Sequence, residues 1–254
     1  MNARQSKSCS SRPALYLSPH IFTCMVGGSL VFLDVKKDRY FGLNTEASRR
    51  VRALLATEAP DTADDAAPEA EHRKALIEDP EIAGLIEEKI LTANASVGKP
   101  FQPIDGPPDL REAPGLLPDE RPKLKAAHVA AFLGAYASAN IRLRLFGLEH
   151  SVNYLKRCKQ RLANTPTGNG GLTRLKELIE MFRLLKPLAA RGTDACLINS
   201  LALATFLAAH GFKTEFCIGV RLDEFGAHAW LQHEDLVLDD FVYAVAPHTR
   251  ILTV

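Results

Sequence analysis

Three residues in the last quarter of the chain carry side chains that together could perform nucleophilic catalysis: Cys196, His228 and Asp240. A thiolate attacks a carbonyl carbon, an imidazole accepts the proton, and a carboxylate orients the imidazole. Cys196 opens the stretch CLINSLALATFLAAH, which has apolar residues at helical spacing and follows two N-cap candidates, Thr193 and Asp194. We therefore expect Cys196 in the first turn of a helix, where free N–H groups and the helix dipole stabilise a thiolate or an oxyanion. The alternative is a buried structural cysteine.

The stretch AHAWLQHEDLVLDD predicts a hairpin that would bring His228 to an acid. With a three-residue loop at 233–235, residue 232 pairs with 236, and His228 lies directly opposite Asp240, with Cβ atoms about 5 Å apart. Asp239 has the opposite parity and should point to the other face of the sheet. This pair could also be a stabilising cross-strand contact without catalysis. A loop of two or four residues would remove the opposition.

Other reactive side chains fit this chemistry less well. His233 falls in the expected turn, where a solvated histidine is the simplest interpretation, and Cys217 is expected to pack within a strand. Ser200 lies one helical turn beyond Cys196 and has no glycine elbow around it. No ligand pair shows the short spacing of a zinc site, so we expect neither a metal nor another cofactor.

The bulk composition is that of an ordinary globular protein. Of the 254 residues 46% are hydrophobic and 24% charged, with a formal net charge of +1, which argues against a general nucleic-acid or membrane-surface binder. There is no apolar run of about 18 residues and no apolar segment behind the charged N-terminus, so we expect neither a membrane span nor a signal peptide. Five widely spaced cysteines without a CxxC pair fit the reducing cytoplasm.

The order of elements predicts an α+β protein in two parts. Residues 14–44 alternate as strands, with a hairpin at Gly27-Gly28-Ser29, and a helix capped by Asn44 or Thr45 follows. An acidic loop at 58–71 precedes two short helical segments broken at Asp79-Pro80. We expect a first domain at 14–96, with three antiparallel strands and three helices, followed by a linker at 97–122 that contains seven prolines. The second domain is expected at 123–254. It should contain helices at 123–146, 149–163 and 172–186, then the helix of Cys196, which ends at Gly211, and antiparallel strands.

The second domain resembles the leader peptidase, or B protein, of lasso-peptide biosynthesis. The resemblance rests on DACLINSLALATFLAAHGFKTEFCIGVR, FGAHAWLQHEDLVLDD and the closing ILTV. It implies a transglutaminase-like, papain-like cysteine protease fold, with Cys196, His228 and Asp240 as the triad. Where many relatives have Asn then Asp, this chain has Asp239-Asp240, so either acid could orient the histidine, although strand parity favours Asp240.

The first domain resembles, more weakly, the PqqD-like precursor-recognition domain, which has a winged-helix-like fold. The hairpin around GGS, RYFGLN leading into a helix, and the last amphipathic helix carry this resemblance. It implies that the domain binds a leader peptide as an added strand, which an exposed sheet edge makes possible. The expected groove walls come from SLVFLDV, RYFGLN and the helix around residue 85; they are Val31, Phe32, Leu33, Tyr40, Phe41, Ile82, Leu85, Ile86 and Lys89. The alternative for most of the apolar ones is the core of the domain.

Three functions follow from these observations. The first is a leader peptidase that cleaves a lasso-peptide precursor, tethered to its substrate by the first domain; the resemblance implies an asparagine-synthetase-like cyclase as partner. The second is acyl transfer to an amine by the same triad. The third is a non-catalytic winged-helix protein that binds a peptide or DNA, against which the lack of a basic recognition helix counts.

Overall fold

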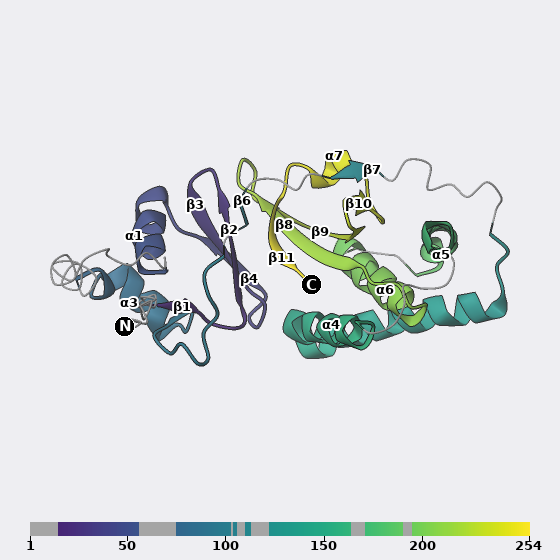
Figure 1. Ribbon diagram of the computed structural model, residues 1–254, viewed down its shortest axis with the longest axis horizontal. Coiled ribbons are helices and arrows are strands. Elements are labelled where there is room, and N and C mark those ends of the chain that lie inside the picture. The colour runs from purple at the N-terminus through teal and green to yellow at the C-terminus, as the bar shows by residue number, and fades with distance from the viewer. Residues whose placement is uncertain are drawn as a thin grey trace, which may run out of the picture.

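The computed structural model describes residues 15–55, 75–102, 104–105, 110–112, 122–163, 171–189 and 195–254. Its two main sheets have the strand orders β4-β3-β2-β6 and β11-β8-β9-β10-β7 (Figure 1). The helices pack on both sheets, so the expected mixed α and β composition is confirmed. Among the described residues, no helix combines the length and apolar character needed to cross a membrane.

The first sheet is the antiparallel meander that the sequence predicts. It contains β2 (Ile21–Val26), β3 (Ser29–Asp34) and β4 (Arg39–Gly42). Val26 pairs with Ser29, so the hairpin turn consists of two glycines only, Gly27 and Gly28, whose φ angles are 56° and 83°. Such positive φ angles favour glycine and match the twist of the two strands.

Helices cover one face of this sheet, and their starts follow local capping chemistry. Asn44 Oδ1 accepts a hydrogen bond from the amide of Ala47 and caps α1 (Thr45–Leu55). Asp79 caps α3 (Pro80–Glu87), which has proline at its first position. A further short helical turn precedes α3 at 75–77, and the expected acidic loop lies outside the described residues. The two-stranded ladder of β1 (Tyr16–Leu17) and β5 (Leu91–Thr92) closes this core.

Described pieces of the proline-rich segment take part in both sheets. β6 (Ile104–Asp105) runs parallel to β2, and β7 (Arg111–Glu112) runs parallel to β10. The expected linker therefore connects the two sheets by adding one short strand to each of them.

The helices of the second half agree with the predicted breaks. α4 (Ala126–Arg161) is interrupted at Gly147, where φ is 77°, so that two helical segments meet where the sequence predicts a gap. α5 (Gly171–Leu185) follows and passes into the short helix η1 (Lys186–Leu188).

The last third of the chain forms the second sheet around one central helix. α6 (Ala195–Ala209) ends before Gly211, whose φ of 84° is that of a C-terminal cap. The elements that follow are β8 (Glu215–Arg221), β9 (Gly226–His233), β10 (Leu236–Val237), α7 (Val242–Val245) and β11 (Thr249–Thr253). All neighbours in this sheet are antiparallel except β7 and β10.

The two halves share a hydrophobic core. In β3 the side chain of Phe32 packs toward α1 and α3, whereas Val31 and Leu33 join the core formed by α4, α5, α6 and the second sheet. The amide of Glu149 on α4 also donates to the carbonyl of Val35 at 3.1 Å. Figure 1 shows the first sheet between α1 and α3 on one side and the strands of the second sheet on the other. The first sheet is therefore buried on both faces.

Candidate active site

Cys196 lies in the first turn of α6 and is half-buried. The two N-cap candidates, Thr193 and Asp194, lie outside the described residues. The following turns of α6 are buried because Leu201, Ala204 and other small or aliphatic residues face the shared core. This packing anchors the helix, and its first turn shares a cavity with residues of β8 and β9.

His228 and Asp240 meet, but not through the register that the sequence predicts. The imidazole Nε2 donates to Asp240 Oδ2 at 2.6 Å. In the hairpin His233 pairs with Leu236 and Gln232 with Val237, so the loop has two residues and the expected three-residue loop is wrong. This loop is possible because Glu234 adopts a positive φ of 56°. In the observed register Asp240 would not lie opposite His228.

The contact forms because the chain leaves the ladder after β10. The amide of Leu231 donates to Asp239 Oδ1 at 2.8 Å, where a longer ladder would supply a backbone carbonyl. The other carboxylate oxygen of Asp239 accepts from Ser200 Oγ, which also lies 3.2 Å from the carbonyl of Ala229. Asp239 thus joins α6, β9 and the segment after β10, and turns Asp240 toward the histidine. The sequence predicts another face for Asp239 but not this network.

The surroundings of His228 confine its ring. It packs near Trp230 and His248, with ring centroids at 6.4 Å and 5.4 Å. On the neighbouring strand the residue paired with His228 is Gly219. A Cβ at Gly219 would lie 2.8 Å from Trp230 and 2.9 Å from His248, so only glycine leaves room for both rings. An isolated glycine within a predicted strand was the sequence signal for this close approach.

The charges at the site favour an ionised pair. A hydrogen bond with His228 lowers the pKa of the Cys196 thiol below its ordinary value of 9.0, against the effect of burial. The hydrogen bond to Asp240, followed by that with Cys196, raises the pKa of His228 to about 9. Burial opposes ionisation of Asp240, but the bond from His228 and a backbone bond from Phe241 bring its pKa below the ordinary value. Because Nε2 of His228 is hydrogen-bonded to Asp240, Nδ1 is the ring nitrogen that can interact with the Cys196 thiol.

A cavity of about 240 Å³ opens beside these residues. Its walls are Asp38, Tyr40, Cys196, Leu197, Ile218, Ala227, His228 and Ala229. Both the thiol and the imidazole therefore face a space large enough for part of a substrate. The cavity also has walls from both halves of the protein, since residues 38 and 40 belong to the first sheet and the turn before it.

Residues 134–253 match the family model of the transglutaminase-like superfamily. The match covers α6, β8, β9 and the segment with Asp240, and so includes Cys196 and His228, which line the cavity, and Asp240, which bonds to His228. The second half of the chain is thus a transglutaminase-like domain. No curated protein and no solved structure showed a significant match to the chain.

The nine residues expected to bind a leader do not line one surface. Val31, Phe32 and Leu33 are 1%, 0% and 0% exposed, because β3 is the central strand of its sheet and both of its faces are covered. These three residues are therefore core residues, and the prediction that they form groove walls is wrong for this structure. Ile82 and Leu85 are buried as well. The exposed or half-buried members of the set are Tyr40, Phe41, Ile86 and Lys89.

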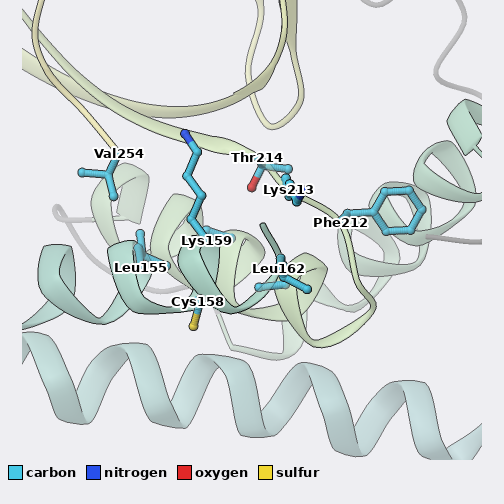
Figure 2. Close-up of a pocket in the computed structure, with 10 residues that line it drawn as sticks. Leu155, Cys158, Lys159, Leu162, Phe212, Lys213, Thr214 and Val254 are labelled. Carbon is cyan, nitrogen blue, oxygen red and sulfur yellow. The ribbon is translucent and has the colours of Figure 1, made fainter. Parts of the chain in front are cut away.

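Two other cavities among the described residues have different linings. One, of about 400 Å³, lies near the start of α4 beside His128 and Arg174, and its walls contain no cysteine or serine. A small cavity of about 20 Å³ between the end of α4, α6 and residues 212–214 has room for about one water (Figure 2). There Lys159 extends toward the sheet and the Cys158 sulfur points the other way. No group of three His, Cys, Asp or Glu side chains in the described segments could hold a metal ion.

Proposed function

We propose that this protein is a cysteine endopeptidase in which Cys196, His228 and Asp240 form the catalytic triad. The observation that carries the proposal is that Cys196 and His228 line one cavity, while the imidazole of His228 is hydrogen-bonded to the carboxylate of Asp240. The transglutaminase-like match supports it, since this superfamily includes cysteine proteases and acyltransferases.

The mechanism follows from the proton positions. Cys196 Sγ, its proton held by His228, attacks the scissile carbonyl carbon, and the carbonyl π electrons move to oxygen. The N–H groups in the first turn of α6 would stabilise that oxyanion. The C–N bond breaks as His228 protonates the leaving amine, which leaves an acyl-thioester. Water, deprotonated by His228, then releases the acid and restores the thiol, while Asp240 keeps the imidazole oriented.

The proposed substrate is the precursor of a lasso peptide, from which the enzyme removes the leader in the cytoplasm. Support comes from the resemblance described above and from the outer edge of β4, with which none of the described strands pairs. Arg39 on β4 lies 2.5 Å from Glu88, just after α3, so strand and helix border a common surface. A leader added along β4 would satisfy the free backbone groups and contact Phe41, Ile86 or Lys89. The partner that uses the product would be an asparagine-synthetase-like cyclase.

Acyl transfer is the second candidate, because the superfamily includes acyltransferases. The same acyl-thioester would then be attacked by an amine in place of water. The two reactions share every residue up to that intermediate and differ only in the second nucleophile.

The test uses the full chain, a synthetic precursor peptide and mass spectrometry. Wild type should release leader and core with one water added across the junction, and Cys196→Ala should release neither. Cys158→Ser is the matched control, since Cys158 is also half-buried but does not line the cavity, and should cleave as wild type does. Cleavage by Cys196→Ala would overturn the proposal. A mass shift equal to an added amine, with putrescine present, would favour the acyltransferase.

A further inference from the structure

The cavity at Cys196 has an aromatic wall that neither half of the protein could form alone. Tyr40 of β4 lines the cavity together with the thiol and the imidazole. Its neighbour Phe41 points the other way and stacks on Phe32 in the first core, at 5.0 Å between ring centroids. Strand alternation therefore directs Tyr40 toward the transglutaminase-like domain.

A second aromatic ring, that of Phe225, packs against Tyr40. Phe225 lies in the turn between β8 and β9, two residues before Ala227, which lines the cavity. Its ring meets Tyr40 edge to face, with centroids 5.9 Å apart and planes at 64°. Phe225 nevertheless remains 60% exposed. A large aromatic side chain that packs on a neighbouring ring and is still mostly exposed leaves apolar area for a ligand to cover.

Tyr40 lies near the reactive groups, since it lines the same cavity as Cys196 and His228. Tyr40 responds electrostatically to Cys196: burial first, then Asp38 and Cys196, raise the pKa of its phenol. Phe225 is three residues before His228 on the same hairpin. An apolar side chain that rested on the two rings would therefore belong to a residue close to the bond under attack.

We propose that Tyr40 and Phe225 form a binding site for an apolar or aromatic side chain of the peptide substrate next to the scissile bond. This assignment rests on the proposed function and adds to it a specificity determinant. It also assigns the first sheet a direct role at the cleft, separate from any capture of the leader at the outer edge of β4. Both residues would bind the substrate and select its side chain, but neither exchanges a proton or an electron pair with it.

The test measures alkylation of Cys196 by two reagents, iodoacetamide and N-(2-phenylethyl)-2-iodoacetamide. In each case the thiolate displaces iodide, and the reagents differ only in the aromatic group. The rate ratio of aromatic to plain reagent is followed by mass spectrometry of the Cys196 peptide and divided by the ratio for glutathione. Wild type should give a corrected ratio of about 10 or more, the usual selectivity of a small apolar pocket.

Two variants and one control decide the assignment. Phe225→Ala removes an exposed ring, so the fold should persist, and Tyr40→Leu keeps an apolar side chain at the packed position. Each should reduce the corrected ratio at least fivefold. Phe146→Ala is the matched control, because Phe146 is also 60% exposed but lies on α4 and does not line the cavity; its ratio should equal that of wild type.

The outcomes separate this inference from the proposed function. A corrected ratio near 1 in wild type, or equal ratios in wild type and Phe225→Ala, would overturn the aromatic site while leaving the triad intact. Slow alkylation by both reagents that does not change in His228→Ala would instead contradict the activated thiol, and with it the peptidase.

Discussion

The imidazole Nε2 of His228 lies 2.6 Å from Asp240 Oδ2, although the β9–β10 ladder does not pair these two residues. The contact exists because Asp239 binds the amide of Leu231 and ends the ladder. The geometry of the site thus depends on a buried carboxylate that does not touch the substrate cavity. Four predictions follow from this arrangement and its neighbours.

Asp240→Asn should weaken the fold and remove a pH dependence. The pKa of His228 is about 9 in the folded protein, above its ordinary 6.5, because of Asp240 first and Cys196 second. The folded state holds this proton more tightly, so the stabilisation is full below pH 6.5 and is lost as the pH rises through 9. A shift of this size corresponds to about 3 kcal/mol. Urea denaturation at pH 6 and pH 10 should show this loss in wild type and a much smaller one in the variant; equal losses would contradict it.

Asp239→Asn should make stability less sensitive to pH between 4 and 6. Burial raises the pKa of Asp239 to about 6 from 3.8, so its contribution is full below pH 3.8 and is lost as the pH rises through 6. An asparagine can still accept from Leu231 and can donate to Ser200, but it does not ionise. Ser200→Ala should move the pH-dependent loss to higher pH, because the serine hydroxyl stabilises the charged form. Denaturation midpoints over pH 4–7 test both variants, and an unchanged profile in Asp239→Asn would be decisive against this account.

Gly219→Ala should displace the rings around His228, although Gly219 itself does not line the cavity. The new Cβ would meet Trp230 at 2.8 Å, and crowding of this kind costs roughly 1 to 3 kcal/mol. Since Trp230 and His248 also confine His228, the cleavage activity proposed above should fall by more than the folded fraction does. Gly134→Ala on α4 is the matched control: its Cβ would meet nothing within 4 Å, and alanine favours a helix by about 1 kcal/mol. A variant at Gly219 with normal stability and activity would refute the packing argument.

The alkylation of Cys196 should have a pH profile that His228 determines. With the thiol pKa lowered mainly by His228, wild type should react with iodoacetamide at a pH below the 9.0 of an ordinary thiol. In His228→Ala the midpoint of the rate should move upward, because burial remains while the hydrogen bond is lost. The apparent midpoints belong to the coupled thiol and imidazole rather than to either group. The same midpoint in both proteins would show that His228 does not activate the thiol.

Much of the fold could be predicted because local chemistry determines where elements begin and end. Gly27 and Gly28 adopt the backbone that only a tight hairpin needs, Asn44 and Asp79 cap helices, and Gly211 ends one. The position of Cys196 in a first helical turn follows from the same signals. These features depend on residues close together in the sequence.

The misjudged features depend on contacts between distant residues. The two-residue loop requires a positive φ at Glu234, which no residue type there signals. The run SLVFLDV has no polar face, as a strand covered on both sides should, but its second cover comes from residues more than 100 positions later. That is why Val31 and Leu33 were expected at a peptide groove and lie in the core. The same docking of the two halves places Tyr40, which the sequence assigns to a leader-binding groove, in the wall of the Cys196 cavity.

The core shared by the two halves links activity to the completion of folding. Tyr40 is made early in synthesis and Cys196 late, and the cavity between them has both walls only when the first sheet has docked. A partly folded chain would carry a cysteine and a histidine but no complete cleft to hold a peptide. For the peptidase proposed above, an unfinished molecule would therefore cleave other nascent proteins poorly.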